Sequence, residues 1–260
     1  MLSLLEAQDT LVIALVVFGF CYLVAIVMLV IGGLLSGHRI AGKVNATTPA
    51  MLTPLGVIAG LLIAFLSARV WSNVDRAQAF VAQEANQIRE AVLLSESLPG
   101  DRKVTIHDGI RHYMQFVERD DWPAMLAGHV SLEQVPPGLP EALTALLAYN
   151  AQHSGEQTAQ RDIARAIEGA LAARRSRILL SQASISATQW IAIIVLDALI
   201  LLTIAMIHVG RHATTAINLF IFSTAVAACL VILMINDRPF SSGGVIVQPR
   251  ALQEIRLPPA

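Results

Sequence analysis

Asp197 is the residue with the clearest chemical potential, because it is an acid near the middle of a long apolar stretch. A carboxyl group at the centre of a membrane-spanning helix costs about 2.5–3.5 kcal/mol on insertion scales, so such residues usually face a polar partner or a wet cavity. One interpretation is an ion or proton site within a helix bundle. The other is a neutral, protonated acid that is hydrogen-bonded to a neighbouring helix, with Asn218 and Thr214 as candidate partners.

A second candidate is a stripe of small side chains at every fourth position, formed by Gly56, Gly60, Ala64 and Ala68. Small residues at this spacing share one face of a helix and let neighbouring helix backbones approach closely. They also leave open space, which a pore needs. We therefore expect Gly56, Gly60, Ala64 and the nearby Ser67 either to pack against another helix or to line a pore.

Signatures of the common enzyme chemistries are missing from the sequence. It contains no G-x-S-x-G, G-x-x-x-x-G-K-[ST], H-E-x-x-H or C-x-x-C motif, which argues against the usual serine nucleophile, phosphate-binding loop and zinc site. His208 and His212 are the only histidines at helical spacing, and no third ligand lies near them in sequence. We expect no enzyme activity, no metal site and no cofactor.

The composition requires an apolar solvent for much of the chain. Of 260 residues, 55% are hydrophobic and 14% are charged, and the mean hydropathy is +0.62. A formal net charge of -1 gives no basic excess of the kind that nucleic-acid-binding proteins show. We therefore predict an all-α, multi-pass protein of the cell (inner) membrane whose partner is the lipid bilayer. Four stretches have the length of a span, about 17–25 residues, and the apolar character: 11–35, 52–68, 190–207 and 214–235.

These expected spans form two pairs, with a polar insert at 69–189 and a C-terminal tail at 236–260. The insert has a helical pattern, since apolar residues recur with spacings of four, three and four from Val81 to Val92. No Pro or Gly occurs between Arg69 and Pro99, so the second span should continue beyond the membrane as one long helix. We predict that the last helix of the insert likewise runs into the third span, and that both extensions form an extramembrane helical domain.

Finer features of the insert follow from its local sequence. A helix over 102–119 should stop near Pro123, because proline disfavours helical backbone in the residue before it. A short helix is expected over 141–151, and Ser154-Gly155-Glu156-Gln157 resembles a capping box that opens the last helix. Residues 245–247 could form a short strand. The following charged side chains are interpreted as solvated helix faces and intrahelical pairs: Asp75, Arg76, Glu84, Arg89 and Glu90.

The side of the membrane that the insert occupies is suggested by the basic residues near the spans. Arg39 and Lys43 follow the first span and no Lys or Arg precedes it, which places the N-terminus and the helical domain outside the cytoplasm. Arg174, Arg175 and Arg177, before the third span, favour the opposite orientation. The count therefore leans toward an extracytoplasmic helical domain.

Several short motifs together resemble a widespread bacterial family of membrane proteins that is described as bestrophin-like and has no assigned function. The resemblance covers nearly the whole chain, including the order and spacing of the four spans. The motifs are Ala64–Asn73 with Trp71, Val81–Asn86 with Glu84, the Asp121-Trp122-Pro123 turn, and Asp237-Arg238-Pro239-Phe240.

The resemblance implies both a fold and an activity. Bestrophins are pentameric ion channels whose pore runs between second-span helices, and they keep the helical extension in the cytoplasm. The chain is therefore expected to form a homo-oligomer that passes inorganic ions, with its second span near the axis. Two departures weaken finer analogies. Bestrophins bind calcium through an acidic cluster after the Pro-Phe turn, whereas Phe240 here precedes Ser-Ser-Gly-Gly. Bestrophin pores also have a neck formed by aromatic residues, and the second span here has only Phe65 and Trp71 as aromatic residues.

Two functional hypotheses follow. In the first, the protein is an oligomeric ion channel of undetermined selectivity, in which the small-residue stripe lines or packs the pore and Asp197 tunes it from the third span. In the second, it is a non-conducting membrane scaffold or sensor whose helical domain binds a partner or ligand. A contiguous exposed apolar patch on the helical domain would favour the second hypothesis.

Overall fold

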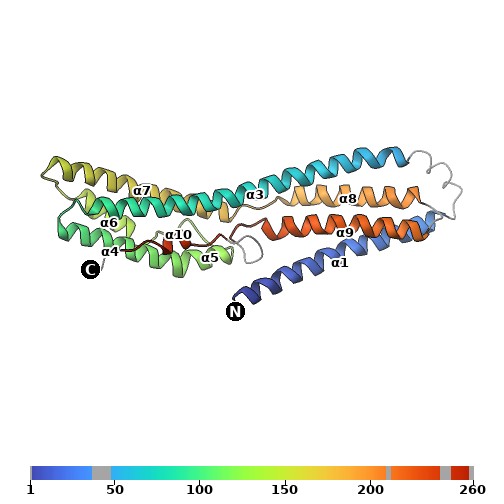
Figure 1. The fold of residues 1–260 in the computed structure, drawn as a ribbon, viewed down its shortest axis with the longest axis horizontal. Coiled ribbons are helices and arrows are strands. Elements are labelled where there is room, and N and C mark those ends of the chain that lie inside the picture. The colour runs from blue at the N-terminus through green and yellow to red at the C-terminus, as the bar shows by residue number, and fades with distance from the viewer. Residues whose placement is uncertain (1, 37–47, 209–211, 241–246, 258–260) are drawn as a thin grey trace. The chain divides into compact units, whose positions relative to one another are not determined.

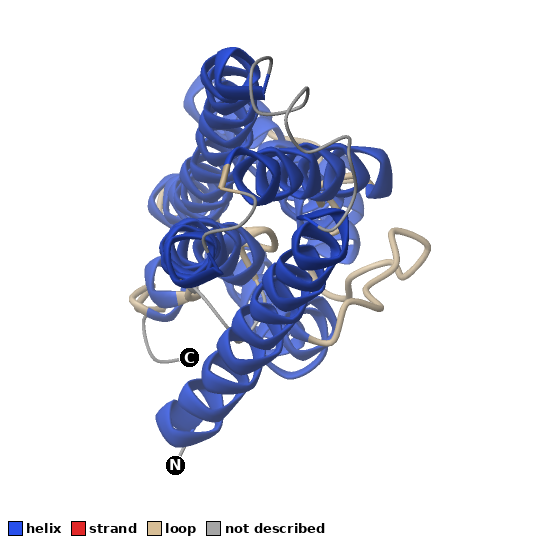
Figure 2. Ribbon diagram, turned by 90° about the vertical axis from the view of Figure 1, so that its right-hand side faces the viewer, coloured by secondary structure: helices blue, strands red, loops and turns tan. Residues whose placement is uncertain are grey.

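The chain folds into helices that belong to two compact units. The computed structural model describes residues 2–36, 48–208, 212–240 and 247–257, and these residues form helices joined by loops (Figure 2). The first unit, here called the membrane unit, comprises Met1–Ser72 and Ser184–Asp237. The second, the helical domain, comprises Asn73–Ala183 and Arg238–Ala260. The C-terminal segment thus packs within the helical domain, far in sequence from its other residues.

The membrane unit contains α1 (Leu2–Ser36), the first half of α3 (Thr48–Ser95), α8 (Ala187–Ile207) and α9 (His212–Asn236) (Figure 1). Among the residues that the structure describes, four helical stretches are long and apolar enough to cross a membrane, and they confirm the predicted all-α fold with four spans: Thr10–Leu34, Pro49–Ser95, Ala187–Ile207 and His212–Asn236.

Small side chains allow close packing inside the membrane unit. A Cβ atom on Gly32 of α1 would lie 3.3 Å from the Cβ atom of Ala205 of α8, so these two helices approach closely at that point. Tyr22 of α1 hydrogen-bonds through its hydroxyl to the Thr224 hydroxyl of α9 at 3.0 Å. Large apolar side chains cover the outside, such as Leu15 with 72% exposed, as expected for a surface that faces lipid.

Helix α3 is continuous through both units, which confirms that the second span extends as one long helix. Within the helical domain its residues Ala77, Val81, Ala85 and Ile88 are buried, each at most 3% exposed. Their spacing matches the apolar stripe expected from the sequence. This stripe therefore forms one wall of the core of the helical domain.

The rest of the helical domain encloses that stripe. Its helices are α4 (Gly100–Phe116), the π-helical turn η1 (Val117–Asp121), α5 (Trp122–Leu126), α6 (Leu139–Leu147), α7 (Ser154–Ser181) and α10 (Arg250–Gln253). Gly138 adopts φ +92°, and it starts α6 directly against Gly109 of α4. A Cβ atom on Gly109 would lie 2.7 Å from the Gly138 carbonyl oxygen, so this contact requires glycine on both sides.

Two predicted helix ends and one predicted helix cap are wrong. The helix expected to stop near Pro123 instead continues through η1 to Leu126, because the wider π turn lets proline enter at the start of α5 without breaking the helix. The short helix ends at Leu147 rather than Ala151. Ser154 is the first residue of α7, with His153 as its N-cap and no side-chain cap. Glu156 instead accepts hydrogen bonds from the Tyr149 hydroxyl and the Gln152 amide, so the expected capping box is absent.

The last helix of the insert does not run into the third span. Helix α7 ends at Ser181 and α8 begins at Ala187. Ser186 caps α8: its hydroxyl accepts a hydrogen bond from the backbone amide of Gln189, and its own backbone is extended. The Ile185 amide, freed by the break, donates to Asp237 Oδ1 at 2.7 Å. Of the proposed strand at 245–247, residues 245 and 246 lie outside the described residues, and Val247 is not in a strand.

Candidate functional site

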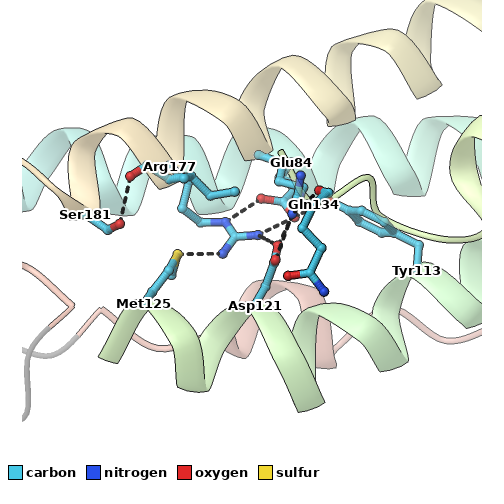
Figure 3. A network of polar contacts seen from close by, with 9 residues as sticks. Glu84, Tyr113, Asp121, Met125, Gln134, Arg177 and Ser181 are labelled. Carbon is cyan, nitrogen blue, oxygen red and sulfur yellow. Dashed lines mark hydrogen bonds and ion pairs between the residues drawn. The ribbon is translucent and has the colours of Figure 1, made fainter. Parts of the chain in front are cut away.

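A buried network of charged side chains ties α3 to α7 in the helical domain (Figure 3). Arg177 donates from Nε to Glu84 Oε2 at 2.8 Å and from Nη2 to Glu84 Oε1 at 3.1 Å. The Tyr113 hydroxyl donates to Glu84 Oε1 at 2.7 Å. Glu84, Tyr113 and Arg177 are all 0% exposed, so the interpretation of Glu84 as part of a solvated face is wrong.

A second ion pair continues the network through Asp121. Arg174 donates from Nε to Asp121 Oδ2 at 2.6 Å and from Nη2 to Asp121 Oδ1 at 2.8 Å. Arg177 Nη2 lies 3.5 Å from Asp121 Oδ2, and Arg177 Nη1 contacts the Met125 sulfur at 3.1 Å. The π turn η1, which ends at Asp121, thus brings its carboxylate to face both arginines of α7.

Electrostatics favours the charged form of Arg177 and the neutral form of Tyr113. Burial by itself lowers the pKa of Arg177, but the Glu84 carboxylate outweighs burial and raises that pKa above its ordinary value. Burial, and then the neighbouring Glu84 charge, raise the pKa of the Tyr113 hydroxyl well above its usual range, so the phenol stays protonated and donates. Two arginines balance two acids, and each named charge has a partner. Such a paired arrangement avoids the cost of an unpartnered buried charge.

Some residues of the motifs that resemble the bestrophin-like family lie beside Arg177. Its guanidinium carbon lies 5.1 Å from the centre of the Trp122 ring, and Trp122 meets Phe240 edge to face at 5.7 Å. Within the C-terminal segment, the Pro239 carbonyl accepts from the Val247 backbone amide at 3.2 Å. Pro123 is exposed in α5, and Trp71, 46% exposed, belongs to the part of α3 in the membrane unit.

His107 of α4 is a buried, neutral member of the same domain. Ser95 Oγ donates to the Val92 carbonyl at 2.6 Å and therefore accepts from His107 Nε2 at 2.9 Å. Burial, and then the nearby Lys103 charge, lower the pKa of His107, and the opposing effects of the Glu96 charge and the Val92 backbone do not cancel this shift. The folded helical domain thus prefers the neutral imidazole.

We expect the melting temperature of the protein to fall as the pH drops below about 6.5, the ordinary histidine pKa. Below that pH, His107 binds a proton in the unfolded chain but resists protonation in the folded protein. The free energy of unfolding that this difference contributes is fully present above the unfolded pKa, and it is lost as the pH falls through the folded pKa. His107→Gln should flatten this dependence between about pH 7.5 and 5.5. His112→Gln, an exposed histidine of the same helix, serves as the control and should retain the slope. Equal slopes in both variants would contradict the assignment.

The small-residue face of α3 is open within the chain. Gly56, Gly60 and Ala64 are exposed and Ser67 is half-buried. A Cβ atom added at Gly56 or Gly60 would meet nothing within 4 Å. The other face of the helix packs into the membrane unit through Ala59, Leu66 and Val70, each at most 6% exposed. The stripe is therefore not packed against any other residue range that the structure describes in the same chain.

Asp197 lies on a different side of the membrane unit. It is 7% exposed and lines a cavity of about 70 Å³ together with Cys21 and Ser223. The residues that line this cavity come from α1, α8 and α9, and none comes from α3. Among the described residues, neither carboxylate oxygen of Asp197 has a hydrogen-bond partner. Asp197 is thus buried and polar, and it lies away from the small-residue face.

The partners expected for Asp197 are wrong. Asn218 instead donates from Nδ2 to His208 Nε2 at 3.2 Å, and Thr214 is exposed. His208 Nδ1 donates to the Ile204 carbonyl at 3.1 Å, so both ring nitrogens of His208 are used. His208 caps the end of α8, whereas His212 begins α9. Among the described residues, no cluster of three or more His, Cys, Asp or Glu side chains could serve as ligands of a metal ion.

The amino-acid sequence matches the model of a known protein family. The family model of the bestrophin-like domain matches residues 18–252. The chain belongs to the bestrophin-like family. No curated protein matches its sequence. The bestrophin-like chain does resemble solved structures, at identities that show a common fold alone.

One such structure is a bacterial bestrophin homologue from Klebsiella pneumoniae with a single substitution. Its TM-score to the bestrophin-like chain is 0.65 at 14% identity, covering 90% of this chain and 94% of that one. A second variant of that homologue gives a TM-score of 0.61 at 13% identity, with coverages of 92% and 96%. A structure described as a membrane protein with a point substitution gives 0.63 at 13% identity, with coverages of 92% and 94%.

Proposed function

We propose that the protein is a homo-oligomeric ion channel of the cell membrane, in which the exposed small-residue face of α3 from each copy surrounds the conduction path. The chain belongs to the bestrophin-like family, and this membership supports the channel, because bestrophins are ion channels whose pore runs between second-span helices. The selectivity of the channel is left open by this proposal.

The exposed small-residue face of α3 is the observation that most supports the channel proposal. Gly56, Gly60 and Ala64 form a smooth strip in a helix whose opposite face is packed. In membranes, small residues at this spacing usually mark close approach of helices, yet no helix in the part of the chain that the structure describes covers them. Copies of α3 arranged around an axis would use this strip, either against one another or as the narrow wall of an aqueous path.

The oligomeric mass of the purified protein tests the assembly. We expect a closed ring of identical copies, each of 27.9 kDa, with five copies as in bestrophins. A mass measured by light scattering with the detergent contribution subtracted gives the copy number. A monomer or a dimer as the only species would contradict the proposal, because neither can enclose an axial path.

We further propose that the membrane is the inner membrane and that the helical domain lies in the cytoplasm, as in bestrophins. We base this orientation on family membership. The count of Lys and Arg residues near the spans favours the opposite, extracytoplasmic placement. The test is labelling of Ser154→Cys, at the exposed start of α7, in a chain with both natural cysteines replaced. A membrane-impermeant thiol reagent should label it in inverted vesicles only, and labelling in intact cells would contradict the cytoplasmic placement.

A further inference from the structure

The loop that joins α5 to α6 (residues 127–138), here called the apolar loop, carries exposed apolar side chains on an anchored backbone. Two of its backbone carbonyls accept hydrogen bonds from side chains of α7 and its C-cap: Gln134 from Arg174 at 3.3 Å and Val130 from Gln182 at 2.9 Å. Despite these anchors, Leu132 is 42% exposed and Val135 is 71% exposed. Large apolar side chains gain free energy when another surface removes them from water, so the apolar loop is suited to contact a partner.

A groove with a mostly apolar lining lies in the same domain, between α4 with η1 on one side and the C-terminal segment on the other. Its volume is about 410 Å³, within the roughly 300–1,000 Å³ of pockets that enclose ligands, so it can accept several side chains. Met114, Leu252 and Leu257 are among the apolar residues that line it, and Arg111 adds a positive charge. The groove thus offers an apolar surface of the kind that the exposed side chains of the loop lack.

The apolar loop and the groove lie on opposite sides of α4. Gly138, at the end of the loop, packs directly against Gly109 of α4, whereas Arg111 of α4 lines the groove. Successive residues of an α-helix are rotated by about 100°, which places Arg111 about 200° from Gly109 around the helix axis. The loop therefore lies away from the groove of its own copy, and a second copy is required to bring the two surfaces together. A closed ring has this property, because each copy presents two different surfaces to its two neighbours.

The charges of the two surfaces favour the same pairing. The apolar loop contains one acid, Glu133, and no Lys or Arg, and Glu133 is exposed. In the groove, Arg111 pairs with Asp108 at the surface, and both side chains of this pair stay partly exposed. The acid of the groove, Glu118, accepts from the Gln253 side chain at 3.3 Å, so it already has a polar partner. A carboxylate that approaches the groove therefore meets an accessible guanidinium group.

We propose that the apolar loop of one copy docks into the groove of the next copy, with Leu132 and Val135 against its apolar lining and Glu133 beside Arg111. The occupant of the groove is thus a second copy of this chain. This inference rests on the ring of the channel proposal, and it names a contact that joins the helical domains of neighbouring copies. A ring held by its membrane units alone could still conduct, so the contact can fail while the channel proposal stands.

Cross-linking of introduced cysteines tests the contact, in a full chain with both natural cysteines replaced. Gln134 of the loop and Gln115 of the groove are both exposed. In Gln134→Cys with Gln115→Cys, a bifunctional maleimide should join copies into a ladder that reaches the full ring, because each copy offers one thiol to each neighbour. Either substitution alone should give at most pairs, since one thiol per chain can join only two copies. Gln134→Cys with Ser154→Cys, at the exposed start of α7, is the control and should give no ladder.

The oligomeric mass of the same sample, measured by light scattering, separates this contact from the ring itself. A ring that gives the ladder only with the loop and groove cysteines together is the expected result. A ring that gives no ladder would overturn the docking of loop into groove, would leave the channel proposal standing, and would make a different protein the candidate partner of the loop. Wild-type protein that is only a monomer or a dimer would overturn both proposals.

A charge reversal covers the case in which the cysteine variants fail to assemble. Glu133→Arg places a second positive charge beside Arg111, so the ring should dissociate at a lower detergent concentration than the wild type. Adding Arg111→Glu to that variant restores opposite charges across the contact and should recover part of the loss. Dissociation of the wild type, Glu133→Arg and the double variant at one detergent concentration would overturn the contact.

Discussion

Replacing Arg177 with methionine is expected to destabilise the helical domain by about 3–5 kcal/mol, the cost of leaving a buried acid without its partner. Methionine keeps much of the side-chain volume, but Glu84 would lose both of its arginine contacts and retain only the Tyr113 hydroxyl. The effect corresponds to a fall in melting temperature on the order of 10 °C for a protein of this size. Thermal unfolding of the purified protein, followed by intrinsic tryptophan fluorescence, measures it.

The double variant Glu84→Gln with Arg177→Met separates charge from packing. It removes both members of the ion pair, and the amide oxygen introduced in place of the carboxylate can still accept from Tyr113, so we expect it to melt above the single variant. Arg165→Met is the surface control, since it breaks only the exposed pair with Asp162, and such pairs contribute about 1 kcal/mol or less. If Arg177→Met melts no lower than Arg165→Met, the network does not hold α7 to α3.

Tryptophan in place of Ala64 should abolish most ion flux through the channel. In Ala64→Trp a large ring would project from the exposed small-residue face of α3. In a narrow path this should reduce flux by about tenfold or more, because conduction depends steeply on pore radius. Flux from liposomes that contain equal amounts of folded protein measures the change, and the oligomeric mass of the variant distinguishes a blocked path from failed assembly.

The matched control adds the same ring elsewhere in the membrane. Leu15 of α1 is 72% exposed, and the proposal places it against lipid, so Leu15→Trp should conduct as the wild type does. Equal flux from Ala64→Trp and Leu15→Trp, with both variants fully assembled, would place the α3 face away from the conduction path.

Much of the fold follows from features that the sequence states directly. A long apolar stretch in lipid must form a helix, because a helix makes all of its backbone hydrogen bonds within itself. The stripe through Val81, Ala85 and Ile88 requires a helix with one buried face. The break between α7 and α8 was harder to predict. No Pro or Gly marks it, and the break depends on the Ser186 cap and on Asp237, which lies 52 residues from Ile185 in sequence.

The charged network shows why burial of polar residues is difficult to infer from one sequence. Glu84 lies among Gln83, Asn86 and Gln87, so local composition indicates a solvated face. Its partner, Arg177, is 93 residues away, and the π turn that aligns Asp121 has no simple sequence signature. A weak signal did exist: Arg174 occupies the helical spacing of the buried residues Ile167, Ala170 and Ile178. An arginine at a core position predicts a buried acid opposite it.

The two candidate features of the spans, the small-residue stripe and Asp197, have surroundings that the sequence did not predict. The small-residue stripe is exposed rather than packed within the chain. A single sequence cannot reveal this exposure, because small residues at this spacing mark packing between copies as well as packing within one copy. The position of Asp197 within an apolar span is evident from the sequence, but its surroundings depend on which helices neighbour α8. Those neighbours, α1 and α9, enclose it away from α3.

The most direct test of the channel is the current itself. Purified wild-type protein of known oligomeric mass, fused into a planar bilayer between two salt concentrations, should give discrete current steps whose reversal potential shifts with the salt gradient. Protein-free bilayers and detergent alone provide the baseline. Step-like currents that follow the gradient are the predicted result. Fully assembled protein that gives no current above the baseline under several salts and voltages would contradict the account.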